Sequence, residues 1–194
     1  MRKTIGVFGS YEPQPGTPLY ALAYKLGQCL GKAGFAVLNG GYDGTMRASS
    51  EGARSVGART IGVTCPAVLR FRGRALATNP FLDEVYPAPT MLARIEAMMR
   101  ASGGYVFLEG GTGTLSELAV MWEYVHKSFL RPRPLVVVGG FWEHLVERIA
   151  AARPGADRHI FRARSAEEVA GVMRRHAVPT RASQHFARLN HRHG

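Results

Sequence analysis

The chain has 194 residues, of which 46% are hydrophobic and 20% are charged, with 23 glycines. This length and composition predict a compact domain with a substantial core and exclude a largely disordered chain. No apolar run approaches the ~20 residues needed to span a bilayer. The two cysteines, Cys29 and Cys65, lie outside any CxxC or Cys/His cluster. We therefore expect a soluble, cytoplasmic protein without a structural metal or a cofactor.

The net charge of +11 is concentrated toward the C-terminus. Residues 153–194 hold nine arginines, no lysine and three acidic residues, which is a net charge of +6, together with five of the seven histidines. Such a basic end attracts polyanions, RNA included, without forming a specific site. A solvated terminus explains the same charge more simply, so the charge alone does not define a function.

Short apolar segments alternate with longer amphipathic ones along most of the chain. The apolar segments are rich in Val, Ile and Phe, as expected of strands buried on both faces. The predicted strands are Thr4–Phe8, Phe35–Asn39, Arg59–Thr64, Gly104–Leu108, Pro134–Val138 and His159–Ala163. The predicted helices are Pro18–Ala33, Thr45–Val56, Thr90–Ala101, Thr114–Phe129, Phe141–Ala152 and Ser165–His176. This alternation predicts an α/β, Rossmann-like, doubly wound fold: a mostly parallel sheet with helices on both faces.

Two stretches depart from the alternation. Pro66–Pro89, which carries three arginines around Phe71, predicts a loop that reaches over the sheet edge or into a neighbouring subunit. After Val178 the periodicity is lost. We therefore expect one Rossmann-like domain over residues 1–177 and a basic tail over residues 178–194.

Three turns rich in small residues follow predicted strands, where ligands of such sheets bind. They are Gly9-Ser10, residues 39–46 (NGGYDGTM) and residues 109–114 (EGGTGT). Glycines let backbone N–H groups approach an anion, and a helix N-terminus adds a favourable dipole. Tight turns alone would explain one such loop, but two at one sheet edge favour a phosphate site. The candidate phosphate-binding residues are Ser10, Gly40, Gly41, Gly44, Gly110, Gly111, Thr112, Gly113 and Thr114.

The chain contains neither GxxxxGK[ST] nor a GxGxxG after the first strand, so a P-loop or a conventional NAD site is not predicted. Glu117 follows Thr114 at the spacing of a capping box, but it also lies one turn into the helix that would hold the phosphate. There it could stabilise positive charge on a ribose ring. Arg94 could extend along the helix surface to solvent, or cross the top of the sheet to clamp phosphate or orient Glu117.

These residues resemble the lonely-guy family of nucleoside 5′-monophosphate phosphoribohydrolases and the related molybdenum-cofactor carrier proteins. The family motif P-G-G-x-G-T-x-x-E is matched by EGGTGTLSE at Glu109–Glu117. A Gly-Gly turn followed by Gly-x-Met is matched at residues 40–46, and a Met-x-x-Arg helix is matched by Met91 and Arg94. The resemblance covers roughly residues 4 to 175.

The resemblance implies a Rossmann-like, usually dimeric protein whose glycine turn holds a nucleotide phosphate. It assigns the catalytic carboxylate to Glu117 and the catalytic arginine to Arg94. The implied reaction cleaves the N-glycosidic bond of a nucleotide such as AMP, or one with a cytokinin-type base, to free base and ribose 5-phosphate. A homodimer or higher homo-oligomer is implied; the apolar helix from Leu115 suits either a subunit contact or ordinary two-sided packing.

Two departures from the family pattern point to a divergent branch close to the carriers. The family proline is Glu109 here, which could point away, mark a different ligand or supply the second carboxylate that most glycoside hydrolysis uses. The fuller Met-His-Glu-Arg-Lys helix motif reads MLARI. A non-catalytic nucleotide or pterin-cofactor carrier is therefore the alternative function, and nucleic-acid binding through the basic tail is a third.

Overall fold

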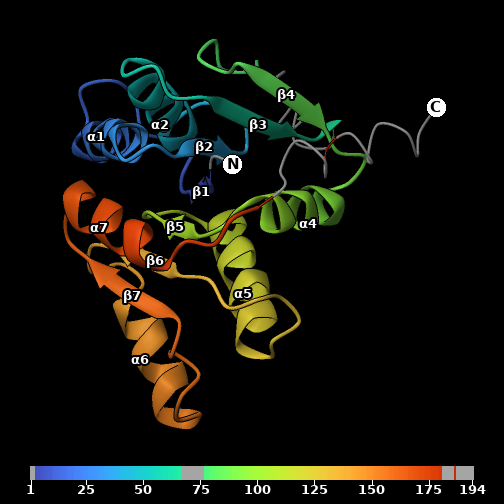
Figure 1. The fold of residues 1–194 in the computed structure, drawn as a ribbon, viewed down its shortest axis with the longest axis vertical. Coiled ribbons are helices and arrows are strands. Elements are labelled where there is room, and N and C mark those ends of the chain that lie inside the picture. Colours follow the sequence, from blue (N-terminus) through green and yellow to red (C-terminus); the bar gives the residue numbers. More distant parts are fainter. Residues whose placement is uncertain (1–2, 67–76, 181–185, 187–194) are drawn as a thin grey trace.

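The computed structural model describes residues 3–66, 77–180 and 186, and it contains a seven-stranded sheet between two helical layers (Figure 1). The strand order is β4-β3-β2-β1-β5-β6-β7, and every neighbouring pair is parallel. The strands are β1 (Thr4–Phe8), β2 (Ala36–Asn39), β3 (Thr60–Thr64), β4 (Glu84–Pro87), β5 (Tyr105–Phe107), β6 (Leu135–Val138) and β7 (Ile160–Ala163). The predicted α/β Rossmann-like fold is confirmed.

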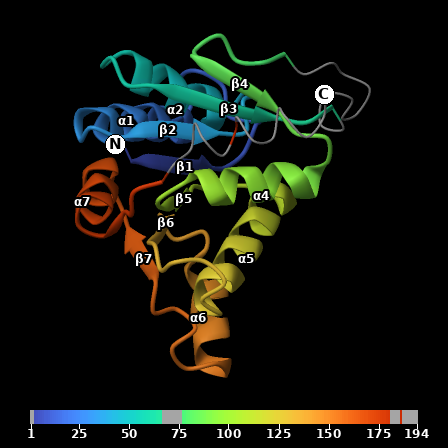
Figure 2. The same ribbon diagram turned by 45° about the vertical axis from the view of Figure 1, so that its right-hand side comes forward.

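Among the described residues, three helices cover each face of the sheet (Figure 2). The helices are α1 (Pro18–Lys32), α2 (Thr45–Arg54), α4 (Met91–Ala101), α5 (Thr112–His126), α6 (Glu143–Ala152) and α7 (Ala166–His176). Helices α1, α2 and α7 pack with one face of the strands into one buried apolar cluster. Helices α4, α5 and α6 pack with the other face into a second cluster. All six helices and all six strands expected from the sequence are present.

The prediction for Pro66–Pro89 is wrong in one part, because Glu84–Pro87 forms the edge strand β4. The alternation of half-buried and exposed residues along β4 differs from the fully buried strands that the apolar runs revealed. Its terminal proline suits an edge strand, where one row of backbone groups has no neighbour. Arg59 pairs with the Glu84 carboxylate and joins β4 to the start of β3. The arginines of residues 67–76 lie outside the described residues.

Part of the expected tail is packed against the domain. Phe186 is fully buried and stacks on Tyr86 of β4, with ring centroids 4.0 Å apart. The Thr180 hydroxyl donates to the carbonyl of Ala101 at 2.8 Å, at the end of α4. The rest of residues 181–194 lies outside the described residues, so the tail's contact with polyanions stays a prediction. In the described part of the chain, no helix is both long and apolar enough to cross a membrane.

Candidate active site

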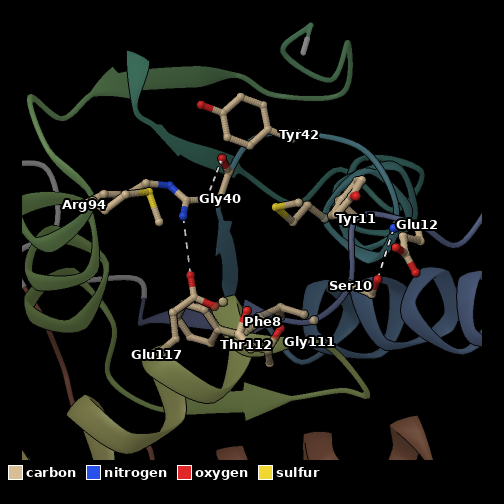
Figure 3. A pocket seen from close by; sticks show the side chains of 16 residues that line it. Phe8, Ser10, Tyr11, Glu12, Gly40, Tyr42, Arg94, Gly111, Thr112 and Glu117 are labelled. Atoms are coloured by element: carbon tan, nitrogen blue, oxygen red, sulfur yellow. Dashed lines mark hydrogen bonds and ion pairs between the residues drawn. The ribbon is translucent and has the colours of Figure 1, made fainter. Parts of the chain in front are cut away.

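A cavity of about 330 Å³ opens at the carboxyl edge of the sheet, beside the central strand β1 (Figure 3). Strands β2 and β5 flank β1, so the strand order reverses here, which is where doubly wound sheets bind ligands. The lining comes from the turns after β1, β2 and β5 and from the start of α4. It consists of Val7, Phe8, Gly9, Ser10, Tyr11, Glu12, Gly40, Tyr42, Met46, Met91, Arg94, Gly111, Thr112, Gly113, Thr114 and Glu117.

The start of α5 presents the glycine turn to this cavity. Gly111 is the N-cap residue, and no side chain caps the helix, so the first backbone N–H groups of α5 remain available to a ligand. Residues 111–114 all line the cavity. Gly110 lies just behind them, where a Cβ atom would stand 2.2 Å from Thr114 Oγ1. The turn therefore combines donors with the positive end of a helix dipole, the arrangement that binds anions.

The turn after β2 plays a different part. The Asn39 side chain accepts a hydrogen bond from the Gly41 N–H at 2.9 Å. At the start of α2, the Thr45 N–H and hydroxyl both donate to the Ser10 carbonyl, at 2.9 and 3.0 Å. Gly44 has a positive φ of 67° and packs against the backbone of Ser10, so a side chain there would be both strained and obstructed. Of the three predicted glycines, Gly40 lines the cavity, whereas Gly41 and Gly44 shape the turn behind it.

Glu117 is a buried carboxylate in this cavity. Because α5 begins at Thr112, Thr114 is its third residue and Glu117 its sixth, so the capping-box interpretation is wrong. The Glu117 residue is only 8% exposed, and its Oε1 lies 3.5 Å from Arg94 Nη1. Burial raises the pKa of Glu117 to about 7, while the Arg94 guanidinium acts in the opposite direction. A proton therefore exchanges at this carboxyl near neutral pH.

Arg94 crosses the top of the sheet, as the second of its two interpretations predicts, and is only 5% exposed. Its Nε donates to the carbonyl of Val63 at 2.7 Å, and its Nη2 donates to the carbonyl of Gly40 at 3.1 Å. These bonds direct the third nitrogen toward Glu117 (Figure 3). Met91, which matches the family's Met-x-x-Arg motif together with Arg94, is 37% exposed and lines the cavity.

The ring of Tyr42 packs against the Arg94 guanidinium. Tyr42 was not identified from the sequence. Its ring lies 5.6 Å from the Arg94 guanidinium, in cation–π range. The Tyr42 hydroxyl donates to the carbonyl of Cys65 at 3.0 Å and accepts from the Cys65 N–H at 2.9 Å. Asn79 donates through its side chain to the Tyr42 carbonyl at 3.2 Å. The one sequence signal was its place directly after the Gly-Gly pair.

The second carboxylate on the cavity is Glu12, not Glu109. Glu109 is exposed and lies outside the lining, and its carbonyl accepts a hydrogen bond from the Ser10 N–H at 3.1 Å. Glu12 lies at the exposed rim, where its N–H donates to the Ser10 hydroxyl at 3.1 Å (Figure 3). Among residues 3–66, 77–180 and 186, no three His, Cys, Asp or Glu side chains gather as a metal site would require.

Residues 2–170 match the family model described as SLOG cluster4 family. The chain belongs to this family. It is 30% identical over 142 residues to a cytokinin riboside 5′-monophosphate phosphoribohydrolase of Mycobacterium tuberculosis, covering 73% of this chain and 72% of the relative. It is 31% identical over 106 residues to a pyrimidine/purine nucleotide 5′-monophosphate nucleosidase of Escherichia coli, which is 51% of this chain and 22% of that relative.

A solved structure supports the fold independently. The molybdenum cofactor binding protein of Rippkaea orientalis superposes with a TM-score of 0.71 at 23% identity, covering 90% of this chain and 97% of that chain. The resemblance to phosphoribohydrolases, inferred from the glycine turn and from Arg94 and Glu117, is therefore confirmed at the level of the family. The likeness to the molybdenum cofactor binding protein is a likeness of fold.

Proposed function

We propose that the protein hydrolyses the N-glycosidic bond of a purine nucleoside 5′-monophosphate to free base and ribose 5-phosphate. The observation that carries the proposal is one cavity that joins an uncapped glycine-rich helix start to the buried Glu117–Arg94 pair. The names of the two sequence relatives support a hydrolase of nucleotide monophosphates.

In the proposed mechanism, the N–H groups of residues 111–114 hold the phosphate, with hydroxyls from Thr112, Thr114 and Ser10. Held in this way, the ribose is fixed against Glu117, so binding is converted into orientation. Glu117 stabilises the oxocarbenium-like centre or positions water. Arg94 positions Glu117, because two of its nitrogens already donate to the carbonyls of Val63 and Gly40.

The proposal is tested by incubating the protein with AMP, GMP, CMP and an N6-isopentenyl AMP, and measuring free base and ribose 5-phosphate by chromatography. Equal amounts of both products from at least one purine nucleotide are expected. Release of base at the uncatalysed rate from every nucleotide would contradict the proposal. The isopentenyl nucleotide distinguishes a cytokinin-type substrate from plain AMP.

A substitution at Gly111 tests the phosphate site separately. The φ of Gly111 is −87°, which alanine adopts readily, and an added Cβ meets no atom within 4 Å. The methyl group would stand over the N–H groups that face the ligand. We expect Gly111→Ala to unfold at the wild-type temperature and to lose most of the stabilisation that AMP confers in a thermal melt. Gly140→Ala is the control, because its Cβ also meets open space but Gly140 does not line the cavity. Loss of AMP stabilisation in both variants would contradict a phosphate site at Gly111.

A non-catalytic carrier of a nucleotide or a pterin-type phosphate cofactor is the second candidate. It is favoured by the likeness to the molybdenum cofactor binding protein. It predicts stabilisation by the phosphorylated ligand without any product. The homo-oligomer implied by the family resemblance remains a proposal, which light scattering tests, and the cytoplasmic location remains a prediction from the cysteine usage.

A further inference from the structure

Glu117 and the start of α5 face the same cavity, so a bound anion and this carboxyl must share one buried space. We propose that the site takes up the phosphate group of its ligand together with one proton, which Glu117 accepts. This inference rests on the proposed phosphate site at residues 111–114. It adds the protonation state of Glu117 in the ligand-bound site.

The surroundings of Glu117 leave its negative charge only partly compensated. The partner that the structure gives its carboxylate is Arg94, at 3.5 Å. That guanidinium also donates to the carbonyls of Val63 and Gly40, so its charge is shared among three acceptors. The raised pKa of Glu117, about 7, agrees with this geometry. In the free site, the Glu117 carboxyl is therefore present near pH 7 in both its protonated and its ionised form.

The other described side chains on the cavity bring no second positive charge to balance an added anion. Arg94 from α4 is the one cation among the described lining residues, and the same lining contains two carboxylates, Glu117 and Glu12. Tyr42, from the turn after β2, has its hydroxyl engaged with Cys65, and burial raises its pKa. Tyr11, from the loop after β1, also faces the cavity and carries no positive charge. A phosphate therefore adds negative charge that no second described cation on the cavity neutralises.

The anion would lie close to Glu117. Residues three apart on a helix lie on the same side of it, which places Glu117 one turn below Thr114. Inside a buried site, two negative charges repel strongly, and this repulsion favours the protonated carboxyl. The ligand-bound site should therefore hold Glu117 as the neutral acid at neutral pH. Anion affinity should fall as the pH rises through 7, because binding must then also draw a proton from solution.

The protonated form suits the proposed reaction. As the C1′–N bond breaks, the Glu117 carboxyl gives its proton to the departing base nitrogen, which keeps the bonding electron pair. The carboxylate that remains then stabilises the oxocarbenium-like centre. Water adds its oxygen to C1′, and the proton that this water loses returns to Glu117. The base leaves as the neutral molecule, the sugar leaves as ribose 5-phosphate, and Glu117 ends as it began.

The experiment measures the binding of sulfate, because sulfate stays a dianion between pH 6 and 8 and adds no titration of its own. Isothermal titration at pH 7 in buffers of different ionisation enthalpy gives the number of protons taken up. For a group with a pKa near 7 in the free site and at least one unit higher in the bound site, about half a proton is expected. Sulfate affinity should fall about 5- to 10-fold from pH 6 to pH 8.

Two isosteric variants assign the proton. Glu117→Gln should bind sulfate with no proton uptake and a flat pH profile. Glu109→Gln, which removes an exposed carboxylate outside the cavity, should keep both the uptake and the slope. Sulfate binding without uptake in the wild type, or uptake that persists in Glu117→Gln, overturns this inference and leaves the phosphate site intact. No sulfate binding at any pH overturns the phosphate site and this inference together, whereas failure of nucleotide hydrolysis alone overturns only the proposed reaction.

Discussion

Replacement of Glu117 by Gln is expected to lower kcat for nucleotide hydrolysis by about 10²- to 10⁴-fold, the usual contribution of a positioned acid or base. The amide keeps the shape of the side chain but can neither carry negative charge nor donate a carboxyl proton. Steady-state kinetics with the preferred nucleotide measures the effect.

The matched control is Glu109, which lies eight residues earlier in the turn before α5. Glu109→Gln makes the same chemical change at an exposed carboxylate outside the cavity, so kcat should stay within about twofold. Nucleotide binding by Glu117→Gln, followed by thermal stabilisation, should persist and show that the site is intact. Equal kcat values for wild type and Glu117→Gln would remove Glu117 from the reaction and favour the carrier function.

Truncation of Arg94 to Ala should abolish hydrolysis and also destabilise the fold, by about 3–5 kcal/mol, as expected when one partner of a buried ion pair is removed. The substitution leaves the carbonyls of Val63 and Gly40 without their donor and Glu117 without its cation. Arg100→Ala on the same helix removes an exposed pair with Glu96 and should cost less than about 0.5 kcal/mol. Urea unfolding of both variants gives these values.

The cost of the Arg94 truncation should depend on pH. In the wild type, the pKa of Glu117 is raised on folding to about 7, so folding stability falls as the pH rises toward 7 and then levels off. Arg94 lowers that pKa, so its removal raises the folded-state pKa further and extends the fall to higher pH. The destabilisation should thus be larger at pH 9 than at pH 6. Equal values at both pH values would mean that Arg94 and Glu117 do not interact.

The sequence was sufficient to predict the fold because five of the seven strands, β1, β2, β3, β5 and β6, are buried on both faces. Runs such as Leu135–Val138 have no exposed residue, and such runs can only be central strands or helix cores. Strand β4 escaped because an edge strand of four residues, half exposed and ending in proline, has no apolar run to detect. Helix α5 begins at Thr112, two residues earlier than predicted, because Gly111 serves as its N-cap and Thr114 does not.

The features of the site that follow from the order of the strands could be predicted from the sequence. The direction of a side chain with several possible hydrogen-bond partners could not. Parallel strands place the turns after β1, β2 and β5 at one edge, so the meeting of the glycine turns followed from the strand order. The sequence left two directions open for Arg94, because only the positions of the Val63 and Gly40 carbonyls decide between them. Glu12 was missed because nothing local marks a rim residue, and Tyr42 because its role depends on Cys65, 23 residues away.

The hydrogen bonds from Arg94 to the main chain give this side chain a structural role in addition to its place in the cavity. The guanidinium completes the hydrogen bonding of backbone oxygens at the ends of β3 and β2, which parallel strands leave without a neighbour. These two bonds stabilise the sheet edge in this chain independently of any reaction in the cavity. Loss of activity on substitution of Arg94 would therefore combine a structural and a chemical effect, and Glu117→Gln is the more direct test of the proposed reaction.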